Sequence, residues 1–138
     1  EWIRDIRSIF IEREDPRSSL KTIEEGIALL NQGFSLVIFP EGTRSKGGQM
    51  GEFKKGSLRL ATKPGIPVVP VTLNGTYRVY EELGYVQSGV SVDFFIHPAI
   101  ETKTLLKSEA NNLAEKVEKI VKTKLIELQE NENGRIST

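Results

Sequence analysis

A short apolar segment that stops at a proline is the feature that most constrains the fold of this chain. Residues 35 to 39 (SLVIF) are rich in β-forming side chains and have a turn signal on each side, which is typical of a buried strand. Pro40 ends the strand because proline has no backbone N–H to donate to a neighbouring strand. Charge, hydroxyls and glycine follow at once in residues 41 to 45 (EGTRS). Ligands bind just past the carboxyl ends of strands in open α/β sheets, so this cluster is a candidate site.

The segments around this strand alternate between helical and strand-like patterns. Asp15-Pro16 is typical of a helix start, and apolar residues then recur at helical spacing until Gly33, a typical helix stop. This pattern predicts a helix over about residues 16 to 32. The remaining patterns predict strands at residues 8 to 11, 66 to 73 and 90 to 96, helices at 53 to 63 and from Ser108, and a weak short helix around 78 to 83. The prolines at 67 and 70 exclude regular central pairing at those two positions.

This alternation predicts an α/β fold in which a mainly parallel or mixed sheet is flanked by helices. We expect a single domain over residues 1 to 138, with a frayed polar tail from 131 to 138. The chain begins at Glu1 and runs almost at once into strand-like sequence, so we expect an N-terminally truncated fragment.

The composition excludes several classes of site. Lys plus Arg and Asp plus Glu both number 19, so nothing favours nucleic-acid binding, and an anion site must be a local cluster. The chain has no cysteine, which excludes a disulfide, a thiolate nucleophile and a zinc–thiolate site, and fits a cytosolic setting. No apolar run approaches the ~20 residues of a membrane-spanning helix, and no signal peptide is visible.

The loop after the strand has several properties of an anion site. Arg44 carries a planar guanidinium that can bind a phosphate through two hydrogen bonds. Lys54 and Lys55 fall in the first turn of the predicted helix, where a positive charge opposes the helix dipole. A phosphate at this helix start would remove that conflict and use the backbone N–H groups there. The alternative is a solvent-exposed turn with ordinary lysines, and the residues alone do not decide between the two.

Two further charged residues have an ordinary and a functional interpretation. Glu41 can form a local ion pair with Arg44, which would orient the guanidinium. Arg13 follows the predicted strand at residues 8 to 11, and it comes beside Arg44 if that strand neighbours the one at 35 to 39. Otherwise Arg13 is a surface arginine.

A nucleotide P-loop and a catalytic histidine both fit the sequence poorly. Residues 51 to 56 have the glycine spacing of a P-loop, but Ser57 stands where its lysine is required. His97 is the single histidine, its neighbours are apolar, and the residue five positions later is Thr102 rather than a carboxylate. These surroundings favour a structural role for His97.

Four segments resemble the glycerolipid acyltransferase family, in the order that the family has them. Residues 39 to 45 (FPEGTRS) resemble the family's third sequence block, and residues 9 to 13 (IFIER) resemble its second block. Residues 53 to 56 (FKKG) resemble the segment after the third block, and residues 66 to 71 (IPVVPV) resemble the fourth. Together the four segments cover roughly residues 8 to 77.

The resemblance implies a function and a set of site residues. The implied reaction moves an acyl group from acyl-CoA or acyl-carrier protein to the free hydroxyl of lysophosphatidate or a related glycerol phosphate, giving phosphatidate. The implied setting is the cytoplasmic face of a membrane, with no metal or redox cofactor and no nucleic acid. The residues implied to hold the acceptor's phosphate are Arg13, Glu41, Gly42, Thr43, Arg44 and Ser45, with Lys54 and Lys55 in support.

The family's first block is not found in this chain. That block is a histidine followed five residues later by an aspartate, and it activates the acceptor hydroxyl. His97 lies after the fourth block and cannot stand in for it. The resemblance therefore predicts no catalytic residue here, and we expect the fragment itself to be inactive. The alternative is a non-catalytic module that binds phospholipids or another anion.

Overall fold

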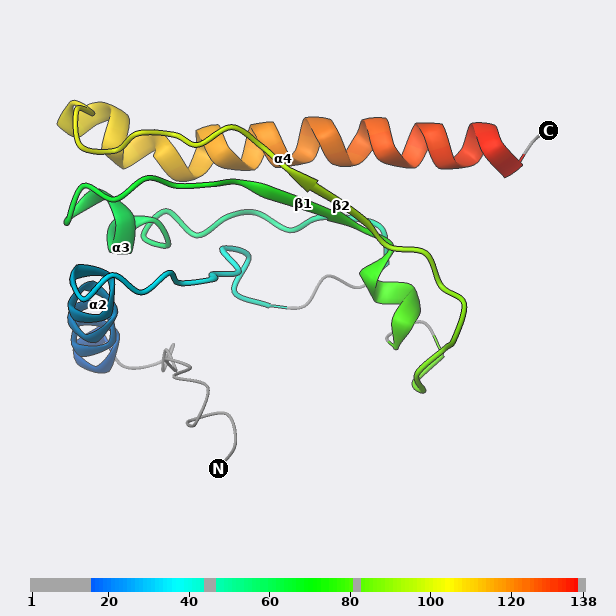
Figure 1. Ribbon diagram of the computed structural model, residues 1–138, viewed down its shortest axis with the longest axis horizontal. Coiled ribbons are helices and arrows are strands. Elements are labelled where there is room, and N and C mark those ends of the chain that lie inside the picture. Colours follow the sequence, from blue (N-terminus) through cyan, green and yellow to red (C-terminus); the bar gives the residue numbers. More distant parts are fainter. Residues whose placement is uncertain (1–15, 44–46, 81–82, 137–138) are drawn as a thin grey trace.

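The computed structural model describes residues 16–43, 47–80 and 83–136. The elements in chain order are helix α2 (Pro16–Asn31), helix α3 (Arg59–Thr62), strand β1 (Val71–Asn74), the 3₁₀ helix η1 (Thr76–Val79), strand β2 (Asp93–Ile96) and helix α4 (Lys107–Ile136). Helix α4 runs along one side of the molecule, the two strands lie beside it, and α2 lies at the opposite side (Figure 1).

Helix α2 forms where the sequence pattern predicts it. Gly33 follows with φ of +88°, a left-handed conformation that glycine adopts without a steric penalty. Its N–H donates to the carbonyl of Leu30, and the N–H of Phe34 donates to the carbonyl of Leu29. This pair of hydrogen bonds satisfies two carbonyls at the helix end, so the predicted stop at Gly33 is confirmed.

The segment over residues 34 to 39 forms neither a helix nor a strand, so the prediction of a strand at 35 to 39 is wrong. The side chain of Ile38 packs against the core, whereas Val37 is 85% exposed and Phe39 is 73% exposed. Within the described ranges no neighbouring strand forms a ladder with this segment. The partner predicted at residues 8 to 11 lies outside the described residues. β-propensity favours an extended backbone, but a strand also needs a paired neighbour.

The sheet in the described part of the chain is a two-stranded antiparallel ribbon, which does not confirm the mainly parallel or mixed sheet that the sequence predicts. The paired residues of β1 and β2 are Val71 with Ile96, Thr72 with Phe95, Leu73 with Phe94, and Asn74 with Asp93. Before β1, the N–H of His97 donates to the carbonyl of Pro70, and the isolated bridge between Val68 and Ile100 continues the pairing. Regular pairing therefore begins just after Pro70, which confirms the predicted effect of the two prolines.

The two faces of the ribbon differ in their surroundings. Thr72 and Asn74 are buried on the face that packs against α4. On the other face, Leu73 and its partner Phe94 are 37% and 62% exposed. The ribbon is thus covered by described residues on one side only.

Helix α4 supplies most of the core. Its residues Leu113, Ala114, Val117 and Val121 form a buried cluster with Leu58. The partly buried side chains that pack on this cluster are Ile38, Met50, Phe53, Val68, Ile100 and Leu105. None of the helices in the described ranges is long and apolar enough to cross a bilayer.

The start of α4 differs from the prediction. The helix begins at Lys107, and the N–H of Leu106 donates to Glu109, so Ser108 lies inside the first turn rather than at the cap. At the other end the helix continues to Ile136, and Glu132 pairs with Arg78 on η1. The frayed tail over residues 131 to 138 stays a prediction.

Candidate functional site

The predicted site contains a tight turn that is tied to a distant part of the loop. The N–H of Gly42 donates to the carbonyl of Phe39 at 3.0 Å, and the φ of Gly42 is +69°. The N–H of Lys54 donates to the carbonyl of Pro40 at 3.0 Å. The carboxylate of Glu41 accepts a hydrogen bond from the N–H of Gly51 at 2.7 Å. The two ends of the glycine loop are thereby held together, and the sequence positions of Arg44 and Ser45 fall within it.

Helix α4 holds the same loop at two further points. The carboxylate of Glu118 accepts from the N–H of Phe53 at 2.8 Å, and the side-chain amide of Gln129 donates to the carbonyl of Gly48 at 2.7 Å. The apolar side chains of Met50 and Phe53 in the same loop pack against the core cluster. The loop is therefore supported by both polar and apolar contacts.

Lys54 and Lys55 are exposed and do not begin a helix, so the predicted helix at 53 to 63 is wrong over its first half. Residues 55 to 58 form turns, with hydrogen bonds from Ser57 to the carbonyl of Lys54 and from Arg59 to the carbonyl of Gly56. Helix α3 covers only Arg59–Thr62, which is too short to offer the helix terminus that the sequence argument required. The electrostatic conflict predicted for the two lysines therefore does not exist.

The backbone N–H groups near the lysines already have partners within the protein. Those of Gly51, Phe53 and Lys54 donate to Glu41, Glu118 and Pro40, respectively. A phosphate at this place would therefore be held by side chains rather than by these backbone groups. This finding replaces the predicted mode of binding at a helix start.

The structure brings together part of the predicted set of site residues. The turn that carries Glu41, Gly42 and Thr43 lies against the backbone of Lys54, and Lys55 follows directly. Thr43 is exposed at the edge of the described residues. Arg13, Arg44 and Ser45 lie outside the described residues, and their roles remain predictions.

The supporting residues of α4 were not predicted from the sequence. Gln129 and Glu132 continue the helical stripe of Val117, Val121 and Leu125, a stripe that is otherwise apolar. A polar side chain in register with a buried stripe is the signal that would have indicated tertiary hydrogen bonds at these positions. Glu118 lies beside this stripe and carried no comparable signal.

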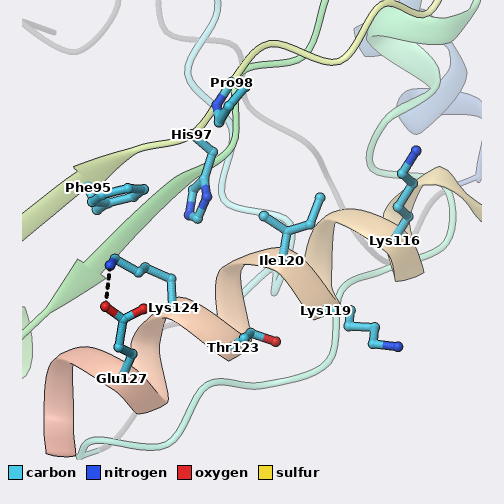
Figure 2. A pocket seen from close by; sticks show the side chains of 9 residues that line it. All are labelled: Phe95, His97, Pro98, Lys116, Lys119, Ile120, Thr123, Lys124 and Glu127. Carbon is cyan, nitrogen blue, oxygen red and sulfur yellow. Dashed lines mark hydrogen bonds and ion pairs between the residues drawn. The ribbon is translucent and has the colours of Figure 1, made fainter.

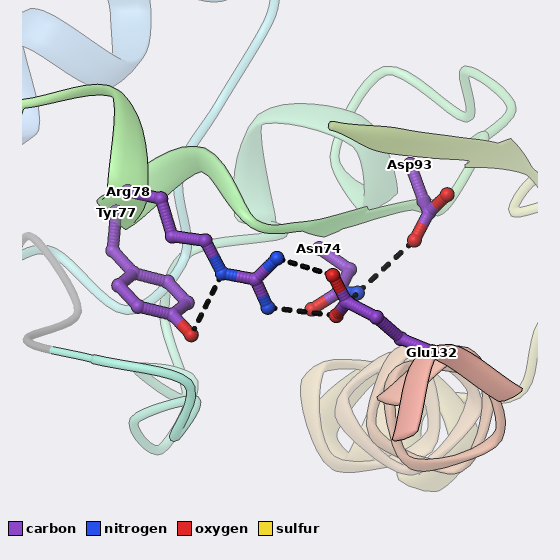
Figure 3. Close-up of polar contacts among 5 residues, drawn as sticks. All are labelled: Asn74, Tyr77, Arg78, Asp93 and Glu132. Carbon is purple, nitrogen blue, oxygen red and sulfur yellow. Dashed lines mark hydrogen bonds and ion pairs between the residues drawn. The ribbon is translucent and has the colours of Figure 1, made fainter. Parts of the chain in front are cut away.

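Glu132 joins α4 to the end of β1 through a polar network (Figure 3). Both terminal guanidinium nitrogens of Arg78 donate to the Glu132 carboxylate, Nη2 at 2.7 Å, and Nε donates to the hydroxyl of Tyr77. The amide of Asn74 donates to Asp93 at 3.0 Å and to Glu132 at 3.3 Å. The hydrogen bonds from Arg78 lower the pKa of Glu132 below its ordinary value of 4.5. The network fixes α4 against the turn that follows β1.

His97 faces an open groove between β2 and α4, with a volume of about 630 Å³ (Figure 2). Its Nε2 lies 2.8 Å from the hydroxyl of Thr72, and its ring packs edge-on against Phe95. Burial, and to a smaller extent the charge of Lys124, lowers the pKa of His97. The amino group of Lys124 lies 4.3 Å from the ring centre of Phe95 and pairs with Glu127 at 2.7 Å. These contacts agree with the structural role predicted for His97.

Comparison with known proteins places the chain in a family. A family model described as Acyltransferase matches residues 1–74, more than half of the 138 residues. This chain belongs to the acyltransferase family. The predicted resemblance to glycerolipid acyltransferases is thereby confirmed, and the match ends at the last residue of β1.

Two relatives of this acyltransferase-family chain are both named as 1-acyl-sn-glycerol-3-phosphate acyltransferases. A 1-acyl-sn-glycerol-3-phosphate acyltransferase of Borreliella burgdorferi is 39% identical over 105 residues, which make up 76% of this chain and 42% of that protein. The chloroplastic 1-acyl-sn-glycerol-3-phosphate acyltransferase BAT2 of Brassica napus is 48% identical over 69 residues, or 50% of this chain and 20% of that protein.

A solved structure extends the likeness to nearly the whole acyltransferase-family chain. The crystal structure of the 1-acyl-sn-glycerophosphate (LPA) acyltransferase PlsC from Thermotoga maritima matches with a TM-score of 0.71 and 32% identity. The match covers 93% of this chain and 50% of the PlsC chain. The fold is therefore of the PlsC type, and the chain spans half the length or less of these three relatives.

Proposed function

We propose that this chain is the phosphate-binding part of an enzyme that acylates lysophosphatidate or a related glycerol phosphate and so makes phosphatidate. The family match over residues 1–74, together with relatives named 1-acyl-sn-glycerol-3-phosphate acyltransferase, carries this proposal. The contact between the Glu41 turn and the backbone of Lys54 supports it, because it brings two segments of the predicted phosphate site together.

In the proposed reaction the acceptor hydroxyl attacks the carbonyl carbon of an acyl thioester. A general base takes the hydroxyl proton, the new ester C–O bond forms, and the C–S bond breaks to release the thiol of coenzyme A or of acyl-carrier protein. No covalent enzyme intermediate is required. The role of this chain is to bind and orient the acceptor through its phosphate, with Arg13, Arg44, Lys54 and Lys55 as the proposed cationic groups.

The general base is proposed to come from outside these 138 residues. The sequence contains one histidine, His97, and its Nε2 is bound to the hydroxyl of Thr72 within the groove beside α4. The sequence has no histidine with an aspartate five residues later. Because the acceptor and product are lipids, the cytoplasmic face of a membrane is the proposed place of action.

Acyl-transfer assays of the chain alone and of the full-length protein that carries it test the proposal. Lysophosphatidate is the acceptor, and acyl-CoA and acyl-carrier protein thioesters of several chain lengths are the donors. We expect transfer by the full-length protein and none by the 138-residue chain, since loss of a general base costs roughly 10²–10⁴ in rate. Intact binding of glycerol 3-phosphate without transfer by the full-length protein would instead favour a non-catalytic anion-binding module.

A further inference from the structure

The segment from Gly48 to Phe53 is fixed at both ends by polar side chains of α4. Gln129 donates to the carbonyl of Gly48 at 2.7 Å, and Glu118 accepts from the N–H of Phe53 at 2.8 Å. Both contacts are made to backbone atoms of the segment. They therefore fix the path of the backbone independently of the side chains of the loop.

The spacing of the two contacts along α4 is similar to the length of an extended segment. Glu118 and Gln129 are eleven positions apart on the helix, which is ~16 Å along its axis. The six residues from Gly48 to Phe53 are joined by five Cα–Cα steps, which span at most ~17 Å when fully extended. In agreement, residues 49 to 54 contain neither helix nor turn, and in Figure 1 this part of the chain runs lengthwise, as α4 does.

The stretched segment also carries the contacts of the candidate site. Gly51, in its middle, donates to Glu41, and Lys54, just after it, donates to Pro40. The place of Lys54 and Lys55 relative to the Glu41 turn thus depends on where α4 holds the segment. Helix α4 (Lys107–Ile136) lies beyond the residues that the family model matches, which end at residue 74.

We propose that Glu118 and Gln129 are positioning residues for the phosphate site. They hold the Gly48–Phe53 segment straight, and this fixes the lysines that follow it against the Glu41 turn. Neither residue touches the phosphate. The inference rests on the function proposed above, because it assumes that the site binds a phosphorylated acceptor.

Glu118 accepts a hydrogen bond and Gln129 donates one, so exchanging carboxylate and amide should have different effects at the two positions. Position 118 needs an acceptor, and glutamine can supply one through its carbonyl oxygen, so Glu118→Gln should be tolerated. Position 129 needs a donor, and a carboxylate cannot donate, so Gln129→Glu should break the contact despite its equal size. Glu118→Leu and Gln129→Leu remove each contact altogether.

Matched controls are available on exposed positions of the same helix. Glu115→Gln removes one negative charge, as Glu118→Gln does, and Asn111→Asp adds one, as Gln129→Glu does. Circular dichroism and thermal unfolding check that each variant folds. If a leucine variant does not fold, the isosteric pair at 118 and 129 decides the question alone.

The measurements are amide hydrogen exchange at residues 49 to 54 and binding of glycerol 3-phosphate to the 138-residue chain. We expect Gln129→Glu, Gln129→Leu and Glu118→Leu to speed exchange and weaken binding by about threefold to tenfold each, the range for one lost hydrogen bond. Glu118→Gln and both controls should stay within about twofold of the unchanged chain.

The outcomes separate the positioning role from the proposed function. If the unchanged chain does not bind glycerol 3-phosphate, the phosphate site itself is wrong and the positioning role falls with it. If the unchanged chain binds but the loosened variants bind equally well, only the positioning role is overturned. Unchanged exchange in Gln129→Glu, or equal loss in Glu118→Gln and Glu118→Leu, also overturns it.

Discussion

The carboxylate of Glu41 binds the backbone N–H of Gly51 across ten positions of sequence, at 2.7 Å. This contact gives Glu41 a role in the loop besides the ion pair with Arg44, which stays a prediction because Arg44 lies outside the described residues. A Cβ atom at position 51 would lie 3.1 Å from the same carboxylate oxygen, so glycine permits the close approach. Glu41 therefore acts on the shape of the loop as a whole.

Glu41→Ala should loosen the loop and lower the free energy of unfolding by about 1 kcal/mol, the scale of one partly exposed hydrogen bond. Glu41→Gln keeps an acceptor and should cost clearly less. Urea unfolding followed by circular dichroism measures both, with Glu52→Ala as a control at an exposed neighbouring position. Equal losses in the alanine and glutamine variants would show that the charge, rather than the hydrogen bond, matters.

Arg44→Ala in the full-length protein should impair use of the phosphorylated acceptor far more than use of the acyl donor. A loss of roughly 2–5 kcal/mol is the scale for removing one partner of a buried charge pair. Arg44→Lys keeps the charge but loses the planar fork, so it should rescue only in part. Acceptor and donor kinetics of the three proteins provide the measurement. Wild-type acceptor kinetics in a folded Arg44→Ala protein would contradict the assignment.

The stability of the fold should fall as pH drops below about 6.5, the ordinary pKa of histidine. Burial, followed by the charge of Lys124, lowers the pKa of His97 in the folded state. Between the two pKa values the unfolded chain binds a proton that the folded chain does not, so unfolding becomes easier. Above pH 6.5 both states are neutral, and this dependence vanishes.

Urea unfolding of wild type and His97→Gln between pH 7.5 and 5 measures this dependence. We expect the stability difference between the two proteins to shrink as the pH falls, because only the wild type loses stability by this route. A difference that stays constant over that interval would show that His97 titrates alike in both states.

Removing the pair between Arg78 and Glu132 should destabilise the end of α4. Each side chain is about a quarter exposed, 29% and 27%, which weakens the pair relative to a buried one. We expect Glu132→Gln to cost about 1 kcal/mol at pH 7. A double-mutant cycle with Arg78→Gln isolates the pair, and additive losses would mean that the two side chains do not interact.

The same pair predicts a second, more acidic transition. Hydrogen bonds from Arg78 lower the folded-state pKa of Glu132 below 4.5. The contribution is therefore complete above pH 4.5 and is lost as the pH falls through the folded-state value. Unfolding measurements from pH 5.5 to 3 should show this loss in the wild type and not in Glu132→Gln.

Local patterns predicted the two long helices, but not the turns at 55 to 58 or the way the strands pair. Helix α2 and its glycine stop follow from the spacing of residues within a few turns of each other. The segment at 34 to 39 has the composition of a strand, but a strand depends on a partner that local pattern does not supply. The turns at 55 to 58 replaced a predicted helix, since Gly56 weakens helical preference there and the contact of Phe53 with Glu118 fixes the chain in another path.

The candidate site was also predicted only in part. The order of the motifs predicted that Glu41 and Lys54 lie close together, because the two segments are close in sequence. The contacts of Glu118 and Gln129 join residues 65 and 81 positions apart. Nothing in the sequence near the loop indicates which side chains of a distant helix will reach it, so these residues had to come from the structure.

The place of α4 in the sequence has a consequence for the order of folding. Four of the five buried apolar residues of the core lie between Leu113 and Val121, and the fifth, Leu58, was synthesised more than fifty residues earlier. A ribosome must therefore release the chain past Val121 before the core can close, and until then Leu58, Met50 and Phe53 have no helix to cover them. Contacts of such long sequence separation slow folding because a large loop must close first. The emerging chain should depend on chaperones over this interval.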